Sequence, residues 1–282
     1  MKKSLAERIA ISRPSPGSIA LFYTGQAGFI LRTPMMSTVG VDLYLSDFLE
    51  GNDGSYKRLI PTVLEPEDLK ADLLVSTHAH EDHLDQGLLD VAVSTLPEMR
   101  YLGSPDCRAM YAQKGVPEDK VTILAKGEST TMMGMNFRGI YADHGELAPD
   151  AMGLLISVAG LNIYFTGDTS CCPEKLAASL GNVSVDIMVV PINPAYGNPG
   201  EEGAAKIAAA IRPRLAIAAH FGMFIEHGGV PGEFLKHAAR LLEGTSTRAI
   251  AMAPGEKMIF SARDGVLDLE TETEAKRRMF HD

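Results

Sequence analysis

The chain has 282 residues, of which 45% are hydrophobic and 22% charged, as in an ordinary globular protein with ample material for a core. Its formal net charge of −10 argues against nucleic acid as a partner, because nucleic-acid-binding proteins usually present a basic surface. No apolar run approaches the ~18 residues of a membrane helix, and no signal peptide is evident. Three cysteines cannot all pair, so we expect a reducing, cytoplasmic location without membrane contact.

The first quarter of the chain predicts a leader, three strands and a long loop. Residues 1–18 form a helical or irregular leader that ends in a segment rich in proline and glycine. Strand-like runs follow at residues 19–24, 28–32 and 39–45. Residues 46–71 are polar, and such a loop often covers or shapes a pocket. In it, Asp47 either lies near a site or caps the loop, and Lys57 and Arg58 either meet an anionic substrate or are simply solvated.

The rest of the chain alternates between strands and helices. Strands are expected at residues 73–75, 101–103, 121–124, 129–133, 136–142, 152–158, 161–165, 185–190, 215–219, 249–251 and 257–262. Helices are expected at residues 84–92, 105–115, 174–180, 201–211 and 231–243. The charged tail from Glu270 should be a surface helix or frayed. Because no low-complexity linker interrupts the pattern, it predicts a single domain over residues 1–282, with two packed sheets covered by helices.

The densest set of candidate metal ligands follows the apolar run at residues 73–75. In an extended segment, side chains two residues apart point the same way, so His78 and His80 can reach one metal ion together. Asp82 and His83 fall where the strand gives way to a helix, which turns them toward a neighbouring point. A polar loop with solvated histidines is the alternative, but this pattern rarely arises by chance. The stretch therefore predicts ligands for two adjacent metal ions, an arrangement that supports hydrolysis.

Three further candidate ligands follow the ends of predicted strands. His144 comes after the strand at 136–142, Asp168 after 161–165, and His220 after 215–219. Each alone would more often be an ordinary loop residue, but loops after strands gather on one rim of an α/β scaffold, and together they favour metal ligation. His227 lies further along, in a glycine-rich loop, where it could act as an acid or donate a hydrogen bond to the substrate.

The pattern of these residues resembles that of the metallo-β-lactamase superfamily. The H-x-H-x-D-H motif is matched by His78, His80, Asp82 and His83, and the later ligands by His144, Asp168 and His220. Within the superfamily the chain is most similar to the branch that contains L-ascorbate-6-phosphate lactonase, through residues 23–29, 163–169, 191–194 and 202–221. The resemblance covers a core of about residues 18–262. The loop at 46–71 is shorter than the insertion of the known lactonase.

The resemblance implies an α/β fold (α+β in some classifications), the four-layer αββα sandwich, with metal ions at the sheet edges. It implies one ion held by His78, His80 and His144, a second held by Asp82, His83 and His220, and Asp168 as a bridge between the two. It favours manganese for the lactonase branch and zinc for the superfamily at large. Imidazole and carboxylate ligands without cysteine also suit iron, so two divalent ions are expected without a choice among the metals.

The site predicts a metal-dependent hydrolase in which Asp82 orients or deprotonates the attacking water. No serine nucleophile elbow competes for the role. By resemblance, the partner is a small-molecule ester or lactone, with a phosphorylated sugar lactone as an anionic candidate. A phosphodiesterase or nuclease would use the same ligands but would need a basic surface. An iron redox relative would normally carry an acidic residue at His80. A non-catalytic metal-binding protein is the remaining alternative, and assembly into a homo-oligomer is left open.

Overall fold

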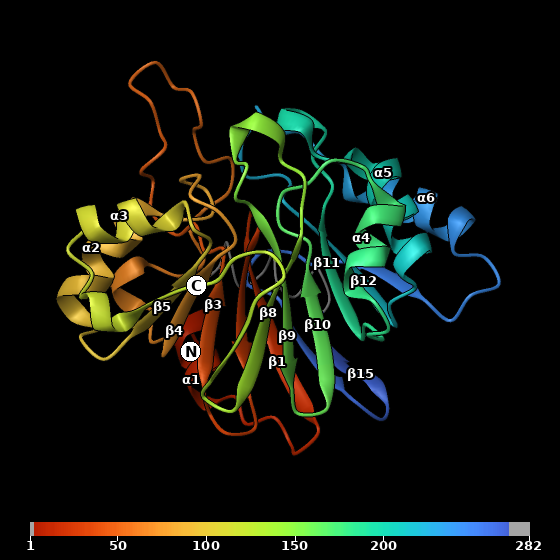
Figure 1. The fold of residues 1–282 in the computed structure, drawn as a ribbon, viewed down its shortest axis with the longest axis horizontal. Coiled ribbons are helices and arrows are strands. Elements are labelled where there is room, and N and C mark those ends of the chain that lie inside the picture. Colours follow the sequence, from red (N-terminus) through yellow and green to blue (C-terminus); the bar gives the residue numbers. More distant parts are fainter. Residues whose placement is uncertain (1–2, 271–282) are drawn as a thin grey trace.

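The structure, a computed structural model, describes residues 3–270, so the predicted tail after Glu270 lies outside the described residues. Two β-sheets lie face to face at its centre, with helices on both outer sides (Figure 1). On one side lie α2 (Gln86–Thr95) and α3 (Cys107–Gln113), and on the other lie α4 (Pro173–Leu180), α5 (Gly200–Ile211) and α6 (Pro231–Leu241). Such layering arises because a sheet with two apolar faces must be covered on both sides. The arrangement confirms the predicted α/β fold, with the layers ordered helix, sheet, sheet, helix.

The first sheet has eight strands in the order β15-β14-β1-β2-β3-β4-β5-β6. Their bounds, in that order, are Gly265–Leu269, Lys257–Ser261, Ser18–Gly25, Gly28–Arg32, Thr38–Val41, Leu73–Ser76, Arg100–Gly103 and Val121–Ile123. The strands from β3 to β6 are parallel to one another. Parallel neighbours need crossover connections, and α2 (Gln86–Thr95) and α3 (Cys107–Gln113) lie in two of them.

The second sheet has seven strands in the order β13-β12-β11-β10-β9-β8-β7. Their bounds, in that order, are Arg248–Ala251, Leu215–Ala219, Ile187–Pro191, Leu161–Phe165, Met152–Val158, Met135–Tyr141 and Ser129–Met132. The strands from β10 to β13 are parallel. Their crossovers contain α4 (Pro173–Leu180), α5 (Gly200–Ile211) and α6 (Pro231–Leu241). None of the helices within residues 3–270 is long and apolar enough to cross a membrane.

The inner faces of the two sheets share one hydrophobic core. β1 shows how the strands divide their side chains, because it is buried along its whole length. Ile19, Leu21 and Tyr23 join the core between the sheets, whereas Ala20 and Phe22 join the core beneath the helices. This alternation follows from the two-residue period of a strand. A strand covered on both faces therefore has the continuous apolar sequence from which it was predicted.

The structure differs from the prediction at several element ends. The strand expected at 39–45 ends at Val41, because Asp42 has φ of +47° and turns the chain. The helix expected from residue 84 begins at Gln86, after Asp85 caps it by accepting a hydrogen bond from the amide of Leu88. β15 was not predicted. The short 3-10 helices are η1 (Pro66–Asp68), η2 (Glu118–Lys120), η3 (Gly145–Leu147) and η4 (Ala195–Gly197).

The leader contains a short helix, α1 (Leu5–Ile11). The hydroxyl oxygen of Ser4 accepts a hydrogen bond from the amide of Glu7 at 3.2 Å, and the Glu7 carboxylate accepts one from the amide of Ser4 at 2.8 Å. This reciprocal pair is a capping box, which satisfies two amides that a helix start otherwise leaves unpaired. The helical alternative predicted for the leader is therefore confirmed over these residues.

Candidate metal centre

The structure brings the seven predicted metal ligands together where strands of both sheets end. His78 follows β4 in the first sheet, whereas His144, Asp168 and His220 follow β8, β10 and β12 in the second. All of the seven are buried except His80, which is partly buried. The inference that loops after strands would converge on one rim was therefore correct for these residues.

The first group of donor atoms belongs to His78, His80 and His144, and these atoms lie within 4.8 Å of one another. Nε2 of His78 is 3.0 Å from Nδ1 of His80. Both ring nitrogens of His144 are buried and have no hydrogen-bond partner among the described residues. A buried polar atom without a partner is unfavourable, so a group bound between the three rings would satisfy one of these two nitrogens.

The second group surrounds the Nε2 atoms of His83 and His220, which are 3.2 Å apart. Nε2 of His220 lies 3.2 Å from Oδ2 of Asp82 and 3.4 Å from Oδ1 of Asp168. Nε2 of His83 lies 3.3 Å from that same Asp168 oxygen and 3.8 Å from Oδ2 of Asp82. Ligands at about 2.0–2.1 Å from a tetrahedral zinc ion are separated by roughly 3.3 Å, so the spacing of these four atoms fits such an ion.

Asp168 presents a different oxygen to each group. Its Oδ1 faces His83 and His220, whereas its Oδ2 lies 3.7 Å from Nε2 of His144. Oδ1 is buried and has no hydrogen-bond donor among the described residues. A carboxylate in this position can touch ions in both groups at once. The donor set and the unpartnered atoms together show that the cluster is capable of binding metal.

The charges in the cluster are matched to cations. Burial alone would raise the pKa of Asp82, but His83 and His220 hold it well below its usual value. Asp168 behaves in the same way, again through His220 and His83. Burial lowers the pKa of His78 well below its usual value. Ionised carboxylates and neutral imidazoles are the forms that bind metal ions.

His83 differs from the other histidines. Burial would lower its pKa, but the carboxylates of Asp168, Asp82 and Asp42 raise that pKa well above its usual value. Three carboxylates around one ring thus favour a positive charge at this point. A metal ion supplies that charge when it replaces the proton.

Three residues that support the cluster were not predicted. Oδ2 of Asp42 lies 3.0 Å from Nδ1 of His83, on the side of the ring away from the donors. The side-chain amide of Asn198 donates to Oδ2 of Asp168 at 2.7 Å. Gln26 donates to Oδ2 of Asp82 at 2.8 Å. The available signals were an aspartate that interrupts an apolar strand and a glutamine in the turn between two strands, and neither has a spacing that identifies its partner.

His227 lies beside the cluster rather than in solvent. One of its ring nitrogens lies within 4.8 Å of a donor atom of Asp82 and of one of His220, so the ring is beside the second group of donors. Gln26 Nε2 lies 2.7 Å from Nδ1 of His227. Burial, followed by the nearby His220, lowers the pKa of His227 to about 4. The ring is therefore uncharged at neutral pH, and donation by Gln26 to Nδ1 leaves Nε2 to carry the hydrogen.

A cavity of about 240 Å³ opens beside the donors. Apart from the donor residues it is lined by Leu49, Tyr56, Glu81, Leu147, Tyr196 and His227. The loop at 46–71 contributes Leu49 and Tyr56, as expected for a loop that shapes a pocket. Asp47 does not reach this cavity, because its carboxylate is mostly exposed and pairs with Arg58 at 2.9 Å.

Strained backbone is concentrated around the cluster. Nine non-glycine residues within residues 3–270 have positive φ, and five of them belong to the cluster, support it or line its cavity: Gln26, Asp42, Tyr56, Tyr196 and His220. Such a conformation costs of order 1–3 kcal/mol and persists only where the surroundings impose it. Residues of this kind gather at functional sites, which supports a functional role for this rim.

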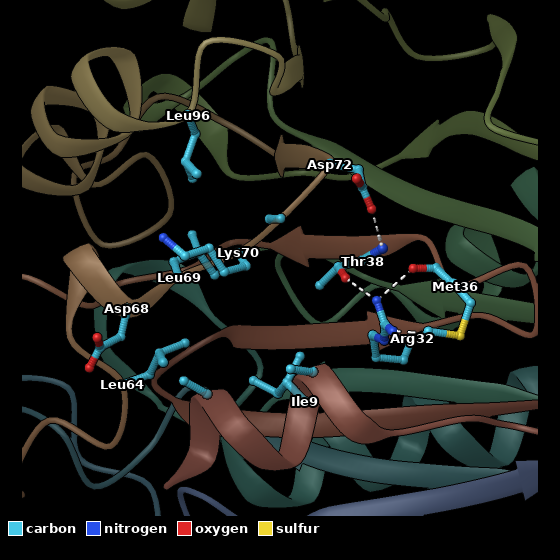
Figure 2. Close-up of a pocket in the computed structure, with 13 residues that line it drawn as sticks. Ile9, Arg32, Met36, Thr38, Leu64, Asp68, Leu69, Lys70, Asp72 and Leu96 are labelled. Atoms are coloured by element: carbon cyan, nitrogen blue, oxygen red, sulfur yellow. Dashed lines mark hydrogen bonds between the residues drawn. The ribbon is translucent and has the colours of Figure 1, made fainter.

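Another cavity, of about 330 Å³, lies between α1, the segment before β4 and the end of α2 (Figure 2). Thr38 begins β3 and Asp72 immediately precedes β4, so this cavity is at the opposite ends of these strands from His78. Its lining contains no histidine. Figure 2 shows Arg32, Thr38 and Asp72 together on one side, joined by hydrogen bonds that Thr38 and Arg32 make within the wall. It is separate from the metal centre.

Comparison with known proteins identifies the class. The model of the beta-lactamase superfamily domain matches residues 49–221, and the chain belongs to this superfamily. The superfamily that its motifs resemble is therefore confirmed.

More particular similarities extend over nearly the whole chain. A UPF0173 metal-dependent hydrolase of Cupriavidus taiwanensis is 26% identical over 275 residues, which cover 89% of this chain and 90% of that protein. The structure of Igni18, a metallo hydrolase from Ignicoccus hospitalis, matches with a TM-score of 0.70 and 21% identity over 86% of this chain and 99% of that one. Isothiocyanate hydrolase from Delia radicum gut bacteria matches with a TM-score of 0.68 and 19% identity, over 86% and 99% of the two chains. The two solved structures support the fold.

Proposed function

We propose that the protein is a metal-dependent hydrolase that acts on a small ester or lactone. The observation that carries the proposal is the carboxylate of Asp168, which presents one oxygen to each of two groups of donors beside a cavity. That cavity, of about 240 Å³, lies below the roughly 300–1,000 Å³ typical of sites for drug-sized ligands, so a small substrate fits it. The relative described as a metal-dependent hydrolase, similar over 89% of this chain, supports the reaction class.

Two divalent ions, zinc or manganese, are proposed for the two groups. His78, His80 and His144 would hold one ion, Asp82, His83 and His220 the other, and Asp168 would contact both. When bound, such ions lower the pKa of water toward neutrality and stabilise negative charge on a carbonyl or phosphoryl oxygen.

The chain's own residues supply orientation and hydrogen bonds. Asp82 lines the cavity with its carboxylate fixed by Gln26, so it can orient the attacking water and accept its hydrogen bond. His227 also lines the cavity, and its Nε2–H can donate to an oxygen of the substrate. This neutral donor role replaces proton donation by a charged imidazole, because its pKa of about 4 leaves the ring uncharged at neutral pH.

Phosphodiester hydrolysis on the same donors has less support. None of the residues that line the cavity, all within the described part of the chain, is lysine or arginine. Bound ions would neutralise the reacting phosphate itself. The adjoining phosphates of a nucleic acid would have no cationic side chain of the lining to pair with. The similarity to the lactonase branch instead favours lactone opening, and a phosphorylated sugar lactone is the candidate that it suggests.

The test is a substrate panel with metal-free protein reloaded with zinc or with manganese. The panel contains a sugar lactone, a 4-nitrophenyl ester, a thioester, a β-lactam, a phosphodiester and an aryl isothiocyanate. We expect metal-dependent opening of the lactone or ester, and a loss of at least about 100-fold in Asp168→Ala. Asp90→Ala, at an exposed carboxylate on α2, is the control. Failure to bind metal, or cleavage of the phosphodiester alone, would overturn the proposal.

A further inference from the structure

The side chains that line the cavity indicate whether the substrate is charged or uncharged. This inference rests on the proposed hydrolytic function. Leu147 and Tyr196 stand at its mouth with 57% and 46% of their surfaces exposed. Because both side chains line the cavity and remain open to solvent, a molecule bound there would contact them. Among the described residues that line the cavity, none is lysine or arginine, and Glu81 is the carboxylate that is not a predicted metal ligand.

Leu147 is held directly against the donors. It ends η3 (Gly145–Leu147), the short turn that follows His144. Its carbonyl oxygen lies 3.2 Å from Nε2 of His80. A group bound next to the first set of donors would therefore meet the leucine side chain. The position favours a hydrocarbon group at this edge of the substrate.

Two tyrosines, Tyr56 and Tyr196, also line the cavity. The hydroxyl groups of Tyr56 and Tyr196 are hydrogen-bonded to each other, and both rings lie edge-on to His227, with centroids 5.9 and 5.5 Å away. The amide of Tyr56 donates to the Glu226 carboxylate at 2.9 Å, which ties the loop at 46–71 to the loop around His227. One phenol donates to the other, so a single O–H of the pair stays free, and both side chains line the cavity.

Arg58, a cationic side chain of the loop at 46–71, is held by contacts outside the cavity lining. The guanidinium of Arg58 pairs with Asp47 at 2.9 Å, donates to the carbonyl oxygen of Ser46 at 2.7 Å, and lies over the ring of Tyr44. Lys57 is exposed and is not part of the cavity lining. Bound ions would neutralise negative charge at the reacting group. An additional anionic group on the far part of the substrate, against Leu49, Leu147 and the tyrosine rings, would lose water without a lysine or arginine in the lining to replace it.

We propose that the cavity selects an uncharged ester or lactone whose small hydrocarbon group packs against Leu147, Leu49 and the tyrosine pair. A substrate with an additional phosphate or carboxylate is disfavoured. This choice of substrate class argues against the phosphorylated sugar lactone suggested by resemblance, while it leaves the hydrolytic chemistry unchanged.

The test compares two lactones that differ in one group. In γ-carboxy-γ-butyrolactone a carboxylate replaces the methyl group of γ-valerolactone, so the reacting ester is the same. We expect the metal-loaded wild type to open γ-valerolactone with a kcat/KM at least about tenfold higher, as measured by proton release. Equal or reversed preference would overturn the proposal. If neither lactone nor any compound of the wider panel is hydrolysed, the proposed function itself fails, and the two failures are thus distinguishable.

Variants at Leu147 locate the preference. Leu147→Arg places a cation beside the cavity. It should raise the ratio of kcat/KM for the carboxylate lactone to kcat/KM for γ-valerolactone at least about fivefold. Leu267→Arg is the matched control, because Leu267 has a similar exposure of 55% and lies on β15, outside the cavity lining. Leu147→Asn, which keeps the size without the hydrocarbon surface, should lower kcat/KM for γ-valerolactone several-fold. An unchanged ratio in Leu147→Arg, together with unchanged γ-valerolactone opening in Leu147→Asn, would contradict the assignment.

Discussion

Oδ2 of Asp42 lies 3.0 Å from Nδ1 of His83, on the edge of the imidazole away from Nε2, which faces the metal donors. Asp42 is itself fixed by Thr77, whose amide and hydroxyl donate to its two oxygens at 2.7 and 2.8 Å. The two atoms are close, although their geometry is not that of a hydrogen bond. The negative charge of Asp42 favours a hydrogen on Nδ1, which leaves Nε2 free to bind a metal ion. One aspartate therefore connects the turn after β3 with the end of the H-x-H-x-D-H motif.

Replacing Asp42 should weaken metal binding without removing a ligand. We expect Asp42→Ala to lower affinity for zinc about 10–100-fold, because His83 loses the carboxylate that favours a hydrogen on Nδ1. Competition with a chromophoric chelator measures the change. Asp47→Ala is the control, since that carboxylate is 62% exposed and pairs only with Arg58 in its surroundings. Equal affinities in the two variants would show that Asp42 does not support the metal.

Removal of metal should abolish hydrolysis reversibly, and Asp168 should determine how many ions return. We expect the reloaded wild type to contain two ions per chain and Asp168→Ala to contain one or fewer, because its two oxygens face different donor groups. Elemental analysis after dialysis measures the ratio. If Asp168→Ala retains two tightly bound ions, the bridging role is wrong.

The stability of the metal-free protein should depend on His227 at acidic pH. Its pKa is lowered from 6.5 to about 4 by burial and by His220, so between these values the unfolded chain binds a proton that the folded chain does not. The contribution of His227 to the free energy of unfolding therefore falls as pH decreases from 6.5 to 4. In His227→Gln this contribution is absent, so the free energy of unfolding should fall less steeply. Urea denaturation at several pH values measures the slopes, and parallel curves would contradict the expectation.

Asp85 should be important for stability rather than for chemistry. Its buried carboxylate accepts hydrogen bonds from the amides of Leu45, Ser46 and Leu88 at 2.8–3.0 Å. Since each buried donor left unpaired costs about 1–3 kcal/mol, Asp85→Ala should lower the free energy of unfolding by at least about 3 kcal/mol. Asp90→Ala, which removes only an exposed pair with Lys114, should change it by less than about 1 kcal/mol. Denaturant titration of both metal-free variants tests this difference.

The sequence predicted the candidate metal ligands, but not the residues that hydrogen-bond to them. His144, Asp168 and His220 were found because each follows an apolar strand, and the ends of neighbouring strands converge in space. Gln26 could not be found in this way, since its partner His227 is 201 residues away and their contact depends on the pairing of distant loops. Asn198 shows the same limit, because only the folded chain brings its amide to Asp168.

The predicted end of β3 was wrong because the backbone departs from regular strand geometry at Asp42. The apolar residues after Asp42 continue the pattern of β3, so residues 39–45 were expected to form one strand. A positive φ at an aspartate leaves no periodic signal, yet it directs the Asp42 carboxylate toward Thr77. For Arg58, a solvated side chain or an anion-binding role was expected, and the structure instead places it in an ion pair with Asp47.

The left-handed residues around the cluster also affect how the molecule takes up and releases ions. Their strain is opposed by contacts such as that of Gln26 with Asp82, which bound ions would reinforce. In the metal-free protein we therefore expect the rim to open locally while the sheets stay intact. Amides near Gln26 and Tyr196 should then exchange with deuterium much faster than those of the central strands. Strain stored in the rim would make local opening, rather than global unfolding, the route by which ions enter and leave.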